Sequence, residues 1–443
     1  MNVKNSYKHL IRAEVSIAPL LTFRLGFGIL TLFSTLRFIC RGWIEQFYLK
    51  PQYFFSYYGF EFIHPFNSEG MYLLFALMCV GTIGICLGLF YRLAALLFFI
   101  TFTYAELIDK TNYLNHYYFV SIISFLMIFL PAGKAFSLDN LIFKKSAITH
   151  VPAWTVNSIK LMIGIVYFYA GLAKINYSWL LEALPLRIWL QARYNYPIIG
   201  NLLTQEWISY FFSWAGCVFD CTIFFFLINR KTRLPAYLMV VVFHLLTRWL
   251  FPIGMFPYIM ILSASIFFSD SVHKKILHAM GYKESHTNIY REHHQKASAF
   301  LLFIFFSIQL LLPWRYILYP GNIFWTEEGY RFAWRVMLME KAGYTNFIVK
   351  DKNHRYGDHV DNYKYLTPYQ IKMMSTQPDM ILQYAHKLRD EYEKKGYLHP
   401  EVYAISYVSV NGSGSRLFLD STRNLSLEKE SFNHKTWIQN DRK

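Results

Sequence analysis

The stretch Val15–Leu36 reads VSIAPLLTFRLGFGILTLFSTL and decides the fold class of this chain. A helix needs about 20 predominantly apolar residues to cross the hydrocarbon core of a bilayer, and this run reaches that length. It is too long for the apolar core of a secretory signal peptide, and no small-residue cleavage site follows it. We therefore interpret it as the first membrane span and not as a cleaved leader.

Apolar runs of similar length recur along the first three quarters of the chain, which has 443 residues, 54% of them hydrophobic and 19% aromatic. This pattern excludes an ordinary soluble globule and predicts a polytopic α-helical membrane protein with about nine transmembrane helices. The seventh and eighth runs are short and flank Pro252, so that pair could also form a broken or re-entrant element. The expected spans are 15–36, 71–90, 91–108, 115–132, 157–176, 206–228, 234–248, 252–269 and 297–316.

The character of the sequence changes to soluble from about Leu318. We predict a membrane domain at residues 1–316 and a small α+β exterior domain with β-hairpin content at residues 317–443. This second domain nearly balances its charges.

Two patterns define the elements of the exterior domain. An apolar stripe at helical spacing predicts one helix over Met373–Lys395. Residues 402–410 alternate as a strand does, and Asn411-Gly412 is a hairpin turn signal leading into residues 416–419.

The net charge of +16 could indicate nucleic-acid binding, but its distribution indicates membrane topology instead. Lys4, Lys8 and Arg12 precede the first span, and most other loop cations fall on the same side by alternation. The positive-inside rule therefore predicts a cytoplasmic amino terminus and an extracytoplasmic C-terminal domain. These cations are Arg92, Lys134, Lys144, Lys145, Arg230, Lys231, Arg233, Lys274, Lys275, Lys283, Arg291 and Lys296.

The five cysteines all lie in or beside apolar segments. They form neither a disulfide framework nor the Cys/His spacing of a zinc site. Cys217 and Cys221 are one helical turn apart, and packing between helices explains them better than a metal does. We expect no metal site.

Lys174 is the most unusual charge in the chain. It lies in the apolar and aromatic stretch Ile165–Tyr177, and no other Asp, Glu, Lys, Arg or His occurs between Lys160 and Glu182. Such an amine must find a partner, reach water or give up its proton. Burial favours the neutral amine, which can act as a general base. The alternative is a lysine near a helix end that extends its amine to the membrane surface.

Other polar residues fall on the same side of the membrane as Lys174. Asp109, Asn115 and His116 lie between the third and fourth spans or at the start of the fourth, and His244 lies near the outer end of the seventh. Ionisable groups within a membrane are costly, so their convergence indicates a functional cavity. Taken singly, Asp109 could pair with Lys110 in a loop, and His116 could be an interfacial residue. The aromatics on this side could wall a pocket for a flat lipid-soluble ring or form an interfacial belt.

Several ordered motifs resemble those of the vitamin K-dependent γ-glutamyl carboxylases, over nearly the whole chain. The compact length is similar to the bacterial members, with an HTTM-like membrane domain. The matching motifs are Asp109–Tyr118 (DKTNYLNHYY), Tyr169–Lys174 (YAGLAK), Phe243-His244, Ile253–Phe256 (IGMF) and Trp325–Trp334 (WTEEGYRFAW).

The resemblance implies a reaction and its co-substrates. Reduced vitamin K loses a proton to a lysine, reacts with O2 and becomes a strong base that removes a γ-proton from a peptide glutamate. The carbanion adds CO2, and the hydroquinone leaves as the epoxide, without metal or biotin.

The resemblance also implies roles for residues of the chain. Lys174 occupies the position of the base, and His116 with Asn115 that of the group assisting the oxygenated intermediate. Cofactor-binding residues are expected at Asp109, Tyr113, Tyr169, His244 and Met255, and substrate-binding residues at Trp325, Tyr330 and Trp334.

Two rival functions stay open. One is a quinol epoxidase that acts on another substrate, and the other is a quinone or lipid transporter or receptor that reuses the fold. The expected partners are a Glu-containing protein or peptide and the membrane quinone. The expected location is a bacterial inner membrane, or the endoplasmic reticulum in a eukaryote. The protein substrate, the quinone tail and the oligomeric state are not defined by the sequence.

Overall fold

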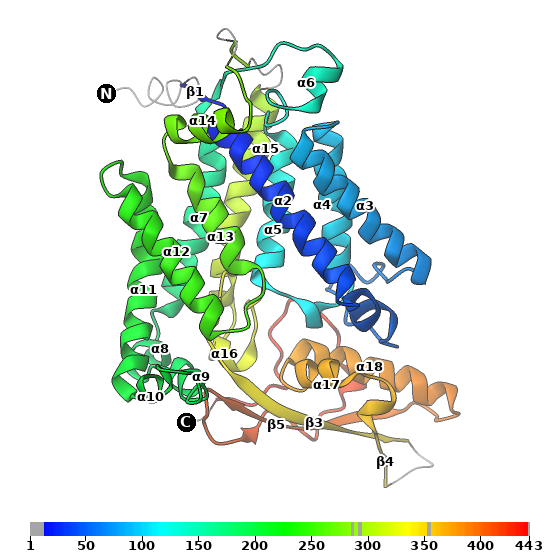
Figure 1. Cartoon of the computed structure of the whole chain (residues 1–443). Coiled ribbons are helices and arrows are strands. Elements are labelled where there is room, and N and C mark those ends of the chain that lie inside the picture. The colour runs from blue at the N-terminus through cyan, green and yellow to red at the C-terminus, as the bar shows by residue number, and fades with distance from the viewer. Residues whose placement is uncertain (1–12, 285–287, 291–294, 352–355, 442–443) are drawn as a thin grey trace.

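The computed structural model describes residues 13–284, 288–290, 295–351 and 356–441. A bundle of long helices occupies one part of the molecule, and an antiparallel sheet with two covering helices lies at one end of it (Figure 1). Lys4, Lys8, Arg12 and Arg291 lie outside the described residues.

Each of the nine expected spans coincides with a helix of the described chain. Five of these are long and apolar enough to cross a membrane: α2, α3, α7, α11 and the segment Ala297–Leu318, formed by α15 and the turn of 3-10 helix after it. The others are shorter or less apolar, so the count of about nine crossings is not confirmed. The bounds are α2 Ala18–Cys40, α3 Ser68–Leu87, α4 Tyr91–Leu107, α5 Asn115–Phe129, α7 Ala153–Lys174, α11 Glu206–Ile228, α12 Arg233–Leu250, α13 Phe256–Ala264 and α15 Gln295–Leu311.

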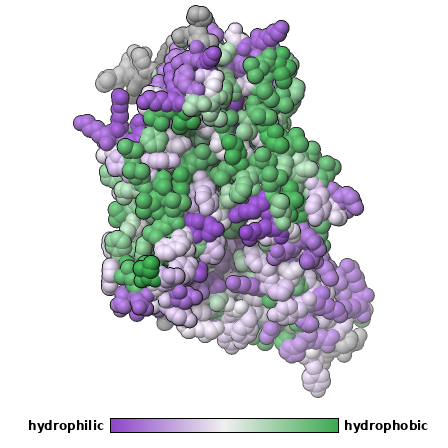
Figure 2. Space-filling model, viewed as in Figure 1, coloured by the Kyte–Doolittle hydropathy of each residue, from purple (hydrophilic) through white to green (hydrophobic). Residues whose placement is uncertain are grey.

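The outer surface of the bundle is apolar. Figure 2 shows hydrophobic residues covering the helices and hydrophilic residues gathered at both ends. Large side chains such as Phe33, Leu93 and Phe303 are more than half exposed on helices α2, α4 and α15. A surface of this kind suits contact with lipid, and it supports the assignment as a membrane protein.

The end of the bundle remote from the sheet carries short elements and basic loops. There β1 (Glu14–Ser16) pairs antiparallel with β2 (His150–Pro152). Helices α6 (Leu138–Ile142) and α14 (Asp270–Ala279) lie at the same end (Figure 1). At the opposite end, three short helices follow α7: α8 Tyr177–Leu181, α9 Leu186–Gln191 and α10 Gly200–Leu203.

The C-terminal region, defined as residues 323–441, contains a four-stranded antiparallel sheet in the order β4-β3-β5-β6. Strands β3 and β5 pair over their full lengths, from Lys341 opposite Val410 to Lys350 opposite Glu401. The bounds are α16 Ile323–Thr326, β3 Lys341–Lys350, β4 Asp358–His359, α17 Pro368–Met374, α18 Pro378–Lys394, β5 Glu401–Val410 and β6 Arg416–Leu417.

The predicted strand and hairpin are confirmed. Strand β5 covers the expected residues, and it turns through Asn411 and Gly412 into β6. Both turn residues have positive φ, 52° and 72°, the region that Asn and Gly tolerate best.

The single helix predicted over Met373–Lys395 is wrong. The structure has two helices, because α17 ends at Met374 and α18 begins at Pro378. Proline has no N–H to donate and its φ is fixed, so it suits the first position of a helix and not the interior. The apolar stripe does face the core, since Ile381, Tyr384 and Leu388 are buried.

The bundle and the C-terminal region interlock. Phe55, from the connection between α2 and α3, is fully buried in the apolar core of the C-terminal region, together with Trp325 and Phe347. Conversely, Trp334 packs in the core of the bundle, where its ring stacks on Tyr118 at 4.9 Å between centroids. The division at residues 316 and 317 stays a prediction.

Candidate active site

Lys174 is the last residue of α7, and it is paired. Its Nζ lies 2.7 Å from Oδ2 of Asp220 on α11, and both side chains are only 7% exposed. Nζ also donates a hydrogen bond to the carbonyl oxygen of Ala170 at 3.2 Å. Of the three ways for this amine to be accommodated, the structure shows the first, a partner.

A glycine one turn earlier allows α7 and α11 to approach closely. A Cβ at Gly171 would lie 2.7 Å from the backbone N of Cys221 and 3.0 Å from the carbonyl carbon of Asp220. Real Cβ atoms essentially never approach heavy atoms so closely, so a larger residue here would push the helices apart. Gly171 therefore lets Lys174 reach Asp220.

A cavity of about 500 Å³ opens beside this ion pair. That volume lies within the range of small-molecule sites. Its polar side chains are Lys174, Asp220, His244, Tyr167 and Thr247, and most of the remaining wall is apolar. Apolar lining residues include Phe219, Phe243, Phe256, Met260, Val336 and Met337.

His244 lines the same cavity as Lys174, and one of its two ring nitrogens has no hydrogen-bond partner among the described residues. Its Nε2 is 2.8 Å from the hydroxyl of Tyr167. Its buried Nδ1 has no hydrogen-bond partner among the described residues. A buried polar atom without a partner is costly.

His116 and Met255 lie in a neighbouring hollow of about 30 Å³. The ring of Phe256 lies close to both histidines, with its centroid 6.0 Å from that of His116 and 5.7 Å from that of His244. Gly254, with φ of +62°, turns the chain close to His116 Nε2. The structure thus brings Lys174 and His244 into one cavity and places His116 in the neighbouring hollow.

Asn115 and Tyr113 join the start of α5 to the C-terminal region. Asn115 Nδ2 donates to the carbonyl of Arg335 at 3.1 Å, and its Oδ1 accepts from the Tyr113 hydroxyl at 3.1 Å. That hydroxyl accepts in turn from the backbone N–H of Phe332 at 2.7 Å. Both residues therefore fix the segment that carries Val336 and Met337 into the cavity wall.

Asp109 and Tyr169 make contacts outside the cavity. Asp109 accepts hydrogen bonds from the backbone N–H of Thr111 and from Gln370 Nε2, each at 2.9 Å. Burial raises the pKa of Asp109 to about 6, although these hydrogen bonds oppose the shift. The Tyr169 hydroxyl donates to the carbonyl of Leu310 at 2.6 Å and so attaches α7 to α15.

Trp325 and Trp334 are packed as interior residues, and Tyr330 is partly buried. Trp325 is 1% exposed, and its Nε1 donates to the carbonyl of Gln439 at 2.7 Å. The ring of Tyr330 lies 6.5 Å from that of Phe324. Substrate contact by these three residues stays a prediction.

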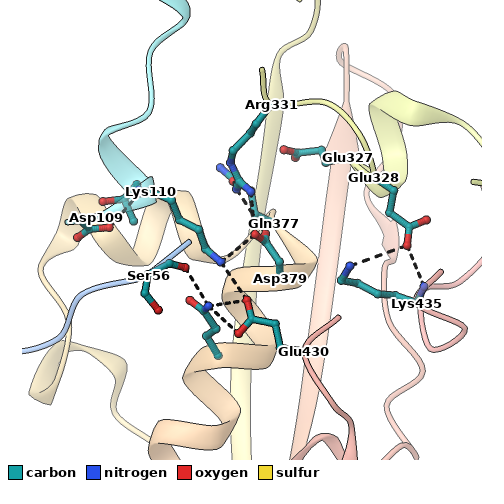
Figure 3. Close-up of polar contacts among 12 residues, drawn as sticks. Ser56, Asp109, Lys110, Glu327, Glu328, Arg331, Gln377, Asp379, Glu430 and Lys435 are labelled. Atoms are coloured by element: carbon teal, nitrogen blue, oxygen red, sulfur yellow. Dashed lines mark hydrogen bonds and ion pairs between the residues drawn. The ribbon is translucent and has the colours of Figure 1, made fainter. Parts of the chain in front are cut away.

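A partly buried charge network joins the two parts of the chain (Figure 3). Lys110 Nζ is 2.8 Å from Oδ2 of Asp379 and 3.7 Å from Oε1 of Glu430. Arg331 Nη1 is 2.7 Å from the same oxygen of Asp379. Burial opposes the charge on Asp379, but Arg331 and Lys110 outweigh it and hold its pKa far below the usual range.

Sequence reasoning missed Asp220, although the sequence held a signal for it. Asp220 is the one Asp, Glu, Lys or Arg between Glu206 and Arg230, in the middle of an expected span. An acidic residue at such a position is rare and marks a functional hypothesis by itself.

The fold and the site together define a multi-pass membrane protein in which a buried lysine and carboxylate border a ligand-sized apolar cavity. Comparison with known families agrees. Residues 13–271 match the HTTM domain, and residues 294–443 match the family described as "Vitamin K-dependent gamma-carboxylase, lumenal domain". The chain belongs to the vitamin K-dependent γ-glutamyl carboxylase family. No solved structure matches it.

Proposed function

We propose that this protein couples oxygenation of reduced vitamin K to the addition of CO2 at the γ-carbon of a peptide glutamate. It would then be a carbon–carbon lyase of the peptidyl-glutamate 4-carboxylase type. The observation that carries the proposal is the Lys174–Asp220 pair at the wall of an apolar cavity of about 500 Å³. Lys174 would receive the proton of a hydroquinone hydroxyl.

The residues present fit a reduced quinone. The aromatic and aliphatic wall, with Phe219, Phe243 and Phe256, suits a flat lipid-soluble ring. Lys174 would bind one hydroxyl, and His244, which lines the same cavity, would offer a second polar contact. An apolar cavity also excludes water, which protects a strong base from quenching.

The strengths of the two acids decide which proton the lysine can remove. A carbon acid beside a carboxylate is far too weak for a lysine to deprotonate, whereas a hydroquinone hydroxyl is within its reach. The bound hydroquinone and O2 together would supply the stronger base. The protein positions the groups, accepts the first proton and excludes water.

The other predicted residues take supporting roles in this proposal. His116, with Asn115, would assist from the hollow beside Phe256, which Met255 also lines. Asp109, Tyr113 and Tyr169 would act on cofactor binding indirectly, through the helices and the segment that they fix. Trp325, Tyr330 and Trp334 would support the glutamate-binding surface.

We also propose the topology that the charge distribution indicates. Residues 1–316 would form the membrane domain with a cytoplasmic amino terminus, and residues 317–443 the extracytoplasmic substrate-binding domain. The reaction would need no metal and no biotin.

Purified protein in detergent tests the proposal. It is supplied with reduced vitamin K, O2, labelled CO2 and a Glu-containing peptide, and both epoxide and fixed label are measured. Lys174→Ala should abolish both products. The matched control is Lys160→Met on the same helix, which should keep them. Full activity in Lys174→Ala would remove the lysine from the mechanism.

The same assay separates the rivals. Epoxide without fixed label from the unaltered protein would support a quinol epoxidase with another substrate. Neither product, from protein with an intact fold, would contradict both enzyme functions and leave a transporter or receptor.

A further inference from the structure

We infer that Asp220 is a positioning residue that forms, with Lys174, a two-residue proton-accepting unit. The inference rests on the proposed function, because it concerns how Lys174 receives the hydroquinone proton. It extends that function to a residue that lies 46 positions further along the chain, on another helix.

The geometry isolates the pair from other charges. Lys174 Nζ contacts Asp220 Oδ2 at 2.7 Å and the Ala170 carbonyl at 3.2 Å, and it lies 5.4 Å from the centroid of the Trp179 ring. Lys174 and Asp220 are the two Asp, Glu, Lys or Arg residues among the described residues that line this cavity. The carboxylate is therefore the group that offsets the ammonium.

A pair serves this cavity better than a single amine does. A lone ammonium in an apolar site is costly, while a hydrogen-bonded pair of opposite charges is neutral as a whole. The same holds after the proton shifts from nitrogen to oxygen. Lys174 can therefore present a neutral amine whenever its proton moves to Asp220, without first releasing that proton to water.

The proton count closes. Before reaction the pair shares one proton beyond the neutral amine and the carboxylate. The O–H bond of the hydroxyl breaks, and its proton bonds to the Lys174 nitrogen while the other proton resides on Asp220. The pair then carries one positive charge, which balances the negative charge left on the ligand oxygen, and no oxidant is involved.

Replacement of the carboxylate gives the first measurement. Asp220→Asn keeps the shape and an acceptor for the ammonium but cannot take its proton. We expect the kcat for epoxide formation to fall on the order of 10²-fold, the scale of a lost acid–base contribution, with little change in KM for the hydroquinone. Asp220→Glu retains a carboxylate and should keep clearly more activity than Asp220→Asn.

Rescue by an external amine gives a measurement that a merely structural role would not affect. Methylamine is added to Lys174→Ala and to the double variant Lys174→Ala/Asp220→Asn, and epoxide is measured. The amine should restore activity when Asp220 is present and restore at least about tenfold less when it is absent. Equal rescue in both variants, or rescue in neither, would overturn the inference.

A control on the same helix separates loss of function from loss of fold. Glu206 on α11 pairs with Arg187 at 2.9 Å, but both side chains are about half exposed. Glu206→Gln should match the unaltered protein in activity and melting temperature. Full activity in Lys174→Ala would refute the base assignment itself. An inactive Lys174→Ala with a fully active Asp220→Asn would overturn the role of Asp220 alone.

Discussion

Replacement of Lys110 by methionine should loosen the joint between the bundle and the C-terminal region. Lys110 belongs to the connection between α4 and α5, and its side chain is only 2% exposed. It contacts Asp379 at 2.8 Å and Glu430 at 3.7 Å. Methionine keeps most of the volume but leaves both carboxylates without this cation.

The magnitude follows from what remains after the change. Removal of one partner from a fully buried ion pair costs about 3–5 kcal/mol. Asp379 keeps Arg331 at 2.7 Å, and the side chains of Asp379 and Glu430 are 24% and 19% exposed, so water offsets part of the loss. We expect a cost of about 2 kcal/mol, or a melting temperature of the C-terminal region lower by roughly 8 °C.

Thermal unfolding in detergent, together with limited proteolysis, measures the effect. The C-terminal region of Lys110→Met should become more sensitive to protease than that of the unaltered protein. Lys50→Met is the control, because Lys50 pairs with Glu45 at 3.8 Å and these side chains are 64% and 57% exposed. Such a pair contributes little. A melting temperature of Lys110→Met indistinguishable from that of the control would refute the reasoning.

Three further changes test other parts of the structure. Burial raises the pKa of Asp109 from 3.8 to about 6. Its contribution to stability should therefore fall by up to about 3 kcal/mol as the pH rises through that window. Asp109→Asn should lack this loss, so its melting temperature should rise relative to that of the unaltered protein over the same window, and parallel profiles would contradict this. Trp325→Ala should destabilise the C-terminal region by about 3–5 kcal/mol, measured by unfolding, because the side chain is 1% exposed in its core. His244→Phe should raise KM for the hydroquinone by about tenfold, the value of one or two hydrogen bonds. A KM equal to that of the unaltered protein would exclude His244 from binding.

The helices of the bundle could be predicted from the sequence because the bilayer imposes a length and a composition on each one. Val15–Leu36 was recognisable for that reason, and α2 covers most of it. The turn at Asn411 and Gly412 could also be predicted from these two residues alone, since few residue types adopt positive φ. The break before Pro378 was visible in the sequence too, but the apolar stripe on both sides of it predicted one continuous helix.

The arrangement of helices around the site could not be predicted in this way. Hydropathy predicts that Lys174, His116 and His244 lie on one side of the membrane, but it carries no information on which helices are neighbours. The contact of Lys174 with Asp220 depends on the crossing of α7 and α11 at Gly171. His116 lines a hollow other than the cavity that Lys174 and His244 share, and this too depends on how the helices pack. Both features can be known only from the three-dimensional structure.

The burial of Phe55 in the C-terminal core has a consequence for how the protein is made. Its core partner Trp325 lies 270 positions later in the sequence. At roughly 5–20 residues per second, the ribosome needs about 15–50 s to reach that partner after Phe55 has been synthesised. During that interval Phe55, in the α2–α3 connection, lacks the residues that cover it in the folded protein. Residues of the C-terminal region are therefore needed to cover the α2–α3 connection, and a chain truncated before Trp325 would leave Phe55 without its core partners.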